Sequence, residues 1–253
     1  MCGRYAASAD VDQLVEEFEI DEITEAPEAP SWNLAPTDPV PAIVERLPRD
    51  AEPDAVAIRK LVQLRWGLVP SWSKDARGGA RMINARFETV DTKPAYRKAF
   101  ATRRCLLPAD GYYEWYAAEG SNSKGPKSKG SRKQPYFIHR GDGDLLVMAG
   151  IYEFWRDEAV PSGGPGAWVA SCSIITTQAT DALGRIHDRM PMIIRREAWD
   201  AWLDPRSTDP DAARSLLSVT DAELLEAYAV GPAVGNVRAD GPDLILPLPE
   251  AGA

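Results

Sequence analysis

The sequence predicts a single domain of the α+β class, and three observations lead to this prediction. The chain has 253 residues, of which 44% are hydrophobic and 26% are charged, a balance typical of soluble globular proteins. A chain of this length can bury a large core without disulfides or metals, and it contains no internal repeat. Strand patterns precede most helical patterns of the second half, which favours α+β over a doubly wound parallel sheet.

The first predicted element is a helix over residues 10–20, where apolar side chains recur at helical spacing after Asp10, a candidate N-cap. Five prolines follow between residues 24 and 41. Because proline lacks an amide donor, we expect an ordered loop or linker there rather than a helix. The next predicted elements are strands at residues 42–46 and 61–68 and a basic helix, broken at Pro94, at residues 89–102.

The middle of the chain is rich in β signals, because runs of aromatic and β-branched residues are separated there by Gly, Pro and Ser clusters. We expect four or more strands, at residues 103–117, 135–140, 144–155 and 167–177. Helical patterns return at residues 180–183, 197–203 and 209–217. Short apolar pieces predict closing strands at residues 227–230 and 244–248.

One low-complexity stretch, residues 119–134, carries basic residues among Gly and Ser between two predicted strands. Its cations are Lys124, Lys127, Lys129, Arg132 and Lys133. The composition predicts a flexible hairpin extension. Such an extension is either a solvated loop or a basic flap that helps to hold phosphates, and the sequence leaves both open.

The charge balance excludes a protein that binds by bulk positive charge. Lys and Arg number 29 against 38 Asp and Glu, a formal net charge of −9. To bind an acidic polymer, this negatively charged protein would therefore need a local cluster of positive charge. Cys2, Cys105 and Cys172 are an odd set without the spacing of disulfide or metal sites, which fits a reducing cytoplasm. The chain has no membrane-length apolar run and no export signal.

Cys2 is the most unusual position, because removal of Met1 would leave an α-amine and a thiol on adjacent carbons. An α-amine has a pKa of about 8, so a useful fraction is neutral and can attack a carbonyl. With an aldehyde the amine would form an imine, which the thiol could close to a thiazolidine; with an amide, the thiol would be the nucleophile. The alternative is that Met1 stays and Cys2 is a small apolar residue before a strand.

Metal and nucleotide chemistry find little support in the sequence. The chain has no HExxH or CxxC motif, and its two histidines, His139 and His187, lie far apart. Gly163, Gly164 and Gly166 form a turn without the lysine of a phosphate loop. We therefore predict no metal, no cofactor and no nucleotide hydrolysis.

Two residues are candidates for proton transfer. Strand alternation places Glu114 on one face with Tyr112 and Tyr116, where enclosure would raise its pKa and make it a proton carrier; a solvated face would not. His187 lies just before an apolar run and is either a positioned proton donor or a surface histidine. His139 falls on the face of Phe137, where we expect a structural role.

Three further residues are candidates for binding. Asn84 and Arg86 point to the same side of a short strand, where they could hold a reacting group and a phosphate or form a structural hydrogen-bonding pair. Trp72 lies in a predicted loop after Pro70, where it either fills the core or stacks on a base.

Seven ordered motifs resemble those of one family. They are MCGRY at the start, NLAP at Asn33–Pro36, RWGLVPSW at Arg65–Trp72, INAR at Ile83–Arg86, ADGYYEW at Ala109–Trp115, IHDRMP at Ile186–Pro191 and VGNVR at Val234–Arg238. Together they are similar to the motifs of SOS response-associated peptidases, the family of abasic-site shielding proteins. The resemblance implies one α+β domain over residues 1–253, with a β-barrel-like antiparallel core flanked by helices.

The resemblance also implies roles for the candidate residues. Met1 would be removed by the protein's own active site, and Cys2 would link to the ring-opened aldehyde of an abasic site in single-stranded DNA through a thiazolidine. Asn84 would orient the Cys2 amine, Glu114 would assist proton transfer in ring opening and imine formation, and His187 would serve proton transfers including reversal.

The same resemblance implies the DNA contacts. Arg4 and Arg86 would grip phosphates beside the lesion, and Trp72 would stack on the bases or wedge them apart, as suits a junction of single- and double-stranded DNA. Many family members carry a second aromatic after this tryptophan, whereas this chain has Ser73, so single-strand binding is the firmer expectation. We expect a cytoplasmic monomer, associated with the nucleoid during repair and with no membrane.

Two other functions stay open on the sequence. A class II glutamine amidotransferase also starts at a cysteine after Met1, but this chain lacks the Asn-Gly-Asp signature of that group. A non-covalent module could instead bind single-stranded nucleic acid through Arg4, Arg86 and Trp72, with Cys2 incidental. Salt-sensitive binding without a denaturant-resistant adduct would favour this module.

Overall fold

Two β-sheets organise the fold. The computed structural model describes residues 2–52, 54–116, 133–161, 163–179, 186–217 and 224–249, and the statements below refer to these residues. The strands of the larger, eight-stranded sheet are β2 (Glu22–Ile23), β4 (Pro39–Arg46), β5 (Ile58–Trp66), β6 (Asn84–Arg86), β7 (Arg104–Ala109), β10 (Leu146–Arg156), β11 (Trp168–Gln178) and β12 (Arg189–Pro191).

Five strands of this sheet close into a barrel. They pair in the order β5-β4-β7-β10-β11, and all four of these pairings are antiparallel. The ring closes where β11 returns to β5 in a short parallel pairing that sets Cys172 opposite Trp66. The predicted α+β class with an antiparallel barrel-like core is therefore confirmed.

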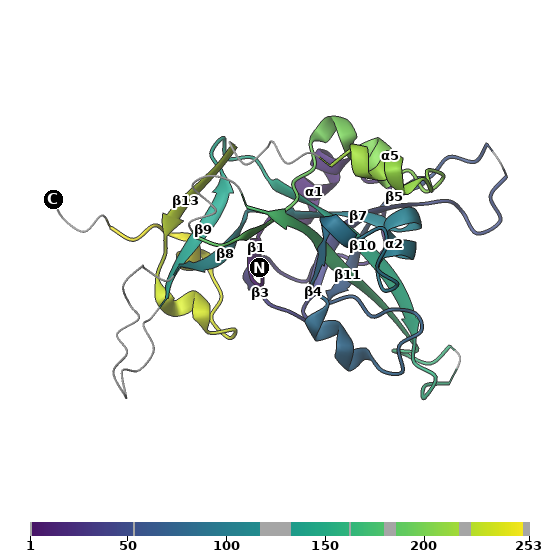
Figure 1. The fold of residues 1–253 in the computed structure, drawn as a ribbon, viewed down its shortest axis with the longest axis horizontal. Coiled ribbons are helices and arrows are strands. Elements are labelled where there is room, and N and C mark those ends of the chain that lie inside the picture. The colour runs from purple at the N-terminus through teal and green to yellow at the C-terminus, as the bar shows by residue number, and fades with distance from the viewer. Residues whose placement is uncertain are drawn as a thin grey trace.

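The second sheet has five strands and lies beside the barrel, at the left of Figure 1. Its strands are β1 (Tyr5–Ala7), β3 (Ser31–Leu34), β8 (Gly111–Tyr116), β9 (Gln134–Arg140) and β13 (Leu225–Ala229). They follow the order β13-β9-β8-β1-β3, and every pairing is antiparallel. The short strand β1 is held on both sides, since Tyr5 faces Leu34 on β3 and Tyr112 on β8.

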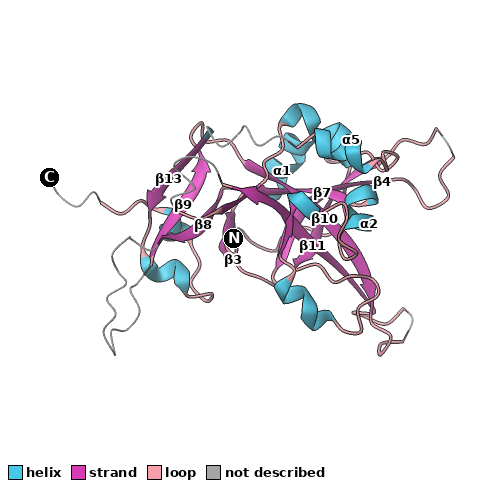
Figure 2. Ribbon diagram, viewed as in Figure 1, coloured by secondary structure: helices cyan, strands magenta, loops and turns pink. Residues whose placement is uncertain are grey.

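Helices cover the outer face of the barrel (Figure 2). The α-helices are α1 (Val11–Phe18), α2 (Arg97–Thr102), α4 (Trp199–Leu203) and α5 (Pro210–Ser215). The 3-10 helices are η1 (Ala76–Arg81), η2 (Phe87–Thr89), η3 (Arg196–Ala198), η5 (Pro232–Gly235) and η6 (Pro242–Ile245). Asp10 caps α1 as predicted, because its side chain accepts a hydrogen bond from the Gln13 amide at 2.8 Å.

Strand alternation separates two cores. On β10, Met148 and Tyr152 face the barrel interior, whereas Val147 and Ile151 face outward to the helices. The interior cluster also contains Cys2, because the chain start enters the mouth of the barrel through β1. The N-terminal residues are therefore part of the core and not an exposed end.

The proline-rich stretch differs from its prediction as a loop. Residues 31–34 form β3, because they lie between Pro30 and Pro36 and keep the amides that pair with β1. The following strand, β4, starts at Pro39 instead of Ala42. Its prolines are tolerated because this part of β4 pairs with β5 alone, while the register with β7 is set at Ile43.

Two other predicted elements are also corrected. The basic helix expected at residues 89–102 is shorter: α2 starts only at Arg97, after Pro94 has interrupted the pattern. The closing strand expected at residues 244–248 is instead the end of η6 and a single bridge between Val230 and Pro247, because the prolines there cannot donate to a ladder. The predicted helix at 180–183 and residues 119–132 of the basic extension lie outside the described residues.

Candidate functional site

The site is built around Cys2, which lies directly before β1 at the mouth of the barrel. Its side chain is fully buried and the thiol is free. Burial raises the pKa of the thiol well above its ordinary value, and the negative charge of the nearby Glu114 carboxylate raises it further. The thiol is therefore held in its neutral form.

Glu114 faces Cys2 from the adjacent strand β8. The predicted alternation is confirmed, since Tyr112 packs in the same core as Cys2 whereas Tyr113 packs in a separate cluster on the other side of the sheet. Only 4% of Glu114 is exposed, and this burial raises the pKa of its carboxyl above the ordinary value. The enclosed alternative of the sequence analysis therefore holds, and the role of Glu114 in proton transfer stays a prediction.

Asn84 approaches Cys2 from the opposite side, on β6. This strand is fixed by a parallel pairing that sets Asn84 opposite Ile174 of β11. The Asn84 Nδ2 donates a hydrogen bond of 2.7 Å to the backbone carbonyl of Cys2. The Oδ1 atom of the same amide is buried and has no hydrogen-bond partner among the described residues, so it is an acceptor available beside the Cys2 backbone.

His187 lies close enough to Glu114 that its charge lowers the pKa of that carboxyl, partly offsetting the effect of burial. Its Nδ1 atom lies 3.0 Å from the Arg189 amide and 2.8 Å from Asp188 Oδ1. The amide can only donate, so it bonds to neutral His187 with the proton on Nε2, while a protonated Nδ1 donates to Asp188. Both protonation states of the ring therefore have a partner.

Glu88 and Arg189 form a connection that the sequence analysis did not anticipate. The Arg189 guanidinium donates to both oxygens of Glu88, at 2.7 and 3.0 Å, and also donates to the Thr176 carbonyl. This bidentate pair ties η2, which follows Asn84, to the segment that carries His187. Glu88 lies two residues after the INAR motif and Arg189 lies within IHDRMP; their opposite charges were the only sequence signal, and their spacing does not show that they meet.

Arg4 is largely buried, with 9% of its surface exposed. Its NH1 donates to Asn33 Oδ1 at 2.8 Å and to the Val234 carbonyl at 2.9 Å. These contacts join the first, second and last of the seven motifs, and they give Arg4 a structural role in holding β1. Its contact with DNA stays a prediction.

The two other candidates for DNA binding are exposed. Arg86 ends β6, two residues after Asn84, and its side chain faces solvent. Trp72 is 68% exposed, so it does not fill the core. Its loop is fixed at the next residue, because the Trp155 Nε1 donates to the Ser73 carbonyl at 2.6 Å. The structure thus brings Cys2 together with Asn84 and Glu114 and places Trp72 on the outer surface.

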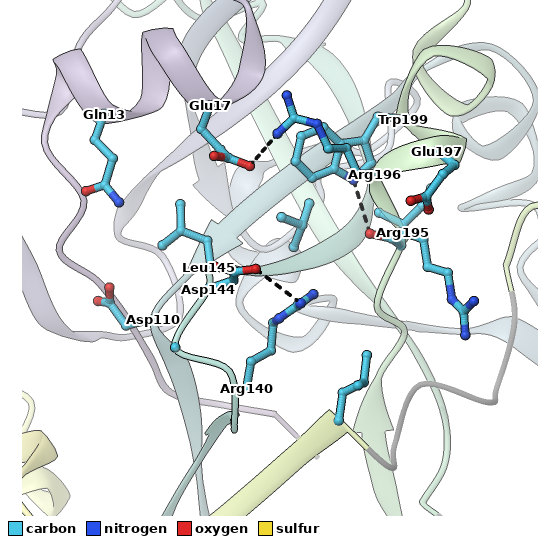
Figure 3. A pocket seen from close by; sticks show the side chains of 14 residues that line it. Gln13, Glu17, Asp110, Arg140, Asp144, Leu145, Arg195, Arg196, Glu197 and Trp199 are labelled. Atoms are coloured by element: carbon cyan, nitrogen blue, oxygen red, sulfur yellow. Dashed lines mark hydrogen bonds and ion pairs between the residues drawn. The ribbon is translucent and has the colours of Figure 1, made fainter.

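A separate hollow of about 830 Å³ lies between α1, the start of β10 and the η3–α4 segment (Figure 3). None of the predicted site residues lines it. Two ion pairs lie among its lining residues: Arg140 with Asp144, four residues further along the chain, and Arg196 with Glu17 of α1 (Figure 3). In the described part of the chain no cluster of three His, Cys, Asp or Glu side chains suits a metal ion, and no helix is long and apolar enough to cross a membrane.

Comparisons with known proteins agree with this geometry. The family model of SOS response associated peptidases (SRAP) matches residues 1–237. The abasic site processing protein YoqW of Bacillus subtilis is 38% identical over 246 residues, covering 97% of this chain and 99% of that protein. The abasic site processing protein HMCES of Gallus gallus is 31% identical over 242 residues, covering 87% of this chain and 66% of that protein.

Solved structures share the fold. A protein from Bacteroides thetaiotaomicron superposes with a TM-score of 0.74 at 23% identity, covering 98% of this chain and 100% of that one. A phage-related protein from Bordetella bronchiseptica superposes with a TM-score of 0.64 at 28% identity, covering 90% of this chain and 94% of that one. The barrel with its accompanying sheet is therefore an architecture shared with these two proteins.

Proposed function

Because the chain belongs to the SOS response associated peptidase family, we propose that it captures abasic sites in single-stranded DNA through a covalent bond to Cys2. The names of its relatives in Bacillus subtilis and Gallus gallus support the processing of abasic sites as its activity. One observation of the site carries the covalent mechanism. Asn84 holds the Cys2 carbonyl through Nδ2 and leaves Oδ1 without a partner beside it.

The mechanism begins with loss of Met1. The Cys2 sulfur attacks the Met1 carbonyl carbon as its proton passes to the Glu114 carboxylate, and the peptide nitrogen leaves with that proton as the Cys2 α-amine. Water then hydrolyses the thioester, which releases methionine and restores the thiol. Glu114 is suited to give the proton to the leaving nitrogen, because burial raises its pKa.

The freed amine then reacts with the open-chain aldehyde of the abasic sugar. Oδ1 of Asn84 accepts a hydrogen bond from the amine and orients its lone pair toward the aldehyde carbon. The nitrogen–carbon bond forms first, and the carbonyl oxygen then takes up protons and leaves as water to give the imine. Glu114 supplies the proton that the departing oxygen needs.

Ring closure makes the adduct stable. The neutral Cys2 thiol adds to the imine carbon, so that a sulfur–carbon bond forms while the electron pair of the C=N bond moves to nitrogen. The thiol proton is transferred to that nitrogen, which completes the thiazolidine. His187, with a partner in each protonation state, serves this transfer and its reversal.

The exposed residues around the site support the DNA contacts of this proposal. Arg86 is positioned to bind a phosphate beside the lesion, and Trp72 offers a face on which a base can stack. Arg4 contributes chiefly by holding β1 through its hydrogen bonds. The substrate is single-stranded DNA, including the single-stranded side of a junction.

The test is a crosslinking reaction between the purified protein and a single-stranded oligonucleotide with one abasic site. We expect the protein mass to lack Met1 and an adduct to survive denaturing electrophoresis. Cys2→Ser, freed of Met1 by a methionine aminopeptidase and checked by intact mass, is the matched variant, because it then has an α-amine at residue 2 but no thiol. It should give an adduct only after reduction with borohydride, which traps an imine.

Three outcomes would contradict the proposal. Retention of Met1 in the purified protein would remove the amine, and an equally stable adduct with Cys2→Ser would remove the thiazolidine. Hydrolysis of glutamine without any adduct would replace DNA capture with amidotransferase chemistry.

A further inference from the structure

The segment between the start of the Trp72 motif and the end of β6 is basic in an otherwise acidic protein. Residues 65–86 contain five cations and a single acid, Asp75, whereas the whole chain has a net charge of −9. The cations are Arg65, Lys74, Arg77, Arg81 and Arg86. A negatively charged protein needs such a local excess of positive charge in order to bind a polyanion.

Part of this segment surrounds an open hollow of about 570 Å³. Lys74, Arg77 and Arg81 line it together with the exposed Trp72. All three cations are exposed at its rim. A hollow with an aromatic face and three cations combines the two features by which single-stranded nucleic acid is bound without sequence preference.

The cations are available to a ligand. Lys74 and Arg81 form no ion pair with any other described residue. Arg77 lies 2.8 Å from Asp75, but 90% of the Arg77 side chain is exposed, so water screens this pair. Phosphates can therefore reach all three cations without breaking a buried contact.

The base of the hollow is rigid although its rim is exposed. Gly67, with φ +127°, packs so closely against Gly79 that an added Cβ would lie 2.5 Å from the Gly79 carbonyl oxygen. Leu68 donates to the Met82 carbonyl at 3.1 Å, which also accepts from the Ser173 hydroxyl. The cations thus project from a fixed backbone, which lowers the cost of ordering them on binding.

We propose that this hollow binds backbone phosphates of the DNA that flanks the abasic nucleotide, with Trp72 stacking on an adjacent base. The inference rests on the proposed function, because it assigns the flanking DNA to a protein that captures the lesion at Cys2. In this proposal, the cations of residues 74–81 hold the DNA before the covalent step. Undamaged DNA of the same length binds the same hollow, because phosphates carry no information about the lesion.

The test uses the triple variant Lys74→Ala, Arg77→Ala and Arg81→Ala and measures its affinity for undamaged single-stranded DNA at several salt concentrations. Each lost phosphate contact lowers the slope of log affinity against log salt by about 0.7, so three contacts lower it by about 2. Between 50 and 200 mM salt, the affinity of the wild type should therefore fall roughly 16-fold more than that of the variant. Crosslinking of abasic DNA should slow at subsaturating DNA and keep its rate at saturation.

The matched control removes the same charge elsewhere, by Arg49→Ala, Arg97→Ala and Lys98→Ala, three exposed residues outside the hollow. An equal salt slope in the two triple variants would overturn the inference. So would a lower crosslinking rate at saturating DNA in the hollow variant whose melting temperature is unchanged, since this would place the residues in the chemistry. A wild type that forms no adduct but shows the expected difference in slope would refute the proposed function and leave the hollow standing.

Shortened substrates show which side of the lesion lies in the hollow. One substrate lacks the nucleotides 5′ of the lesion and another lacks those 3′ of it. The difference in salt slope between the wild type and the triple variant should disappear with only one of them, the one that lacks the DNA bound in the hollow. Pairing that side with a complementary strand then shows whether the hollow holds a single strand or a duplex arm. If neither shortening changes the difference, the cations do not bind DNA next to the lesion and the inference is wrong.

Discussion

Replacement of Glu114 by glutamine tests the proton transfers on which covalent capture depends. Glutamine preserves the shape of the side chain but cannot carry a proton between reacting groups. General acid–base catalysis contributes about 10²- to 10⁴-fold to a rate. We predict a loss of about 10²-fold, at the lower end, because His187 lies within electrostatic range of Glu114 and offers a second route for protons. Single-turnover crosslinking at saturating abasic DNA measures the loss.

The pKa of Glu114 adds a dependence on pH and stability. Burial raises this pKa above the ordinary value of 4.5. A carboxyl with a raised folded-state pKa stabilises the fold below its unfolded pKa, and this contribution is lost as the pH rises through the folded pKa. Above the folded-state pKa the wild type therefore carries a buried charge that glutamine lacks. Glu114→Gln should be at least as stable in that pH range, and its crosslinking rate should not show the decrease with rising pH that we expect of the wild type.

Glu153→Gln is the matched control, because Glu153 is also buried but lies on β10 away from Cys2. Its carboxylate pairs with Arg103 at 2.7 Å, so the substitution should cost about 1–3 kcal/mol of stability and leave the crosslinking rate unchanged. The reasoning fails if Glu114→Gln crosslinks at the wild-type rate. It also fails if Glu153→Gln loses as much crosslinking rate as Glu114→Gln, since the lost rate would then reflect damage to the fold.

Two other predictions concern the framework of the site. Arg4→Met should lower the free energy of unfolding by about 2–4 kcal/mol, because buried acceptors on Asn33 and η5 lose their donor. If denaturant unfolding gives the variant the same free energy of unfolding as the wild type, Arg4 does not have this structural role. Gly67→Ala should cost about 2–3 kcal/mol, because of its positive φ and its contact with Gly79, whereas Gly241→Ala meets open space at a similar φ of +121° and should cost less. Equal melting temperatures for the two alanine variants would contradict the close packing beneath the basic hollow.

Local patterns predicted most of the strands and the face of β8 on which Glu114 lies. Alternation along residues 111–116 separated Tyr112 from Tyr113, and the structure places these two residues in different cores. Barrel closure was not accessible in this way. It depends on the pairing of Cys172 with Trp66, a parallel contact between strands distant in sequence, and no local period records such a pairing. The β3 strand was missed because proline counts over a whole stretch hid a proline-free piece within it.

The assembly of the site illustrates the same limit. Residue chemistry singled out Cys2, and the family motifs linked it to Asn84, but only the fold shows the hydrogen bond between residues 82 positions apart. Arg4 shows the opposite case, since the family resemblance implied that it binds phosphate while the fold gives its NH1 two buried acceptors. Charge and residue type thus predict what a side chain can do, and burial determines which of these roles it can perform.

Burial also determines the order of the chemical steps. The pKa values of Cys2, Cys105 and Cys172 are all raised by burial, so none of these thiols supplies much thiolate at neutral pH. A neutral thiol is a poor nucleophile toward an aldehyde, whereas an α-amine with a pKa of about 8 is partly neutral and reactive. In the proposed mechanism the amine of processed Cys2 therefore attacks first, and the thiol adds only to the more electrophilic imine. Cys105 and Cys172 share the burial but have no α-amine, so the proposed capture of the lesion requires the cysteine at residue 2.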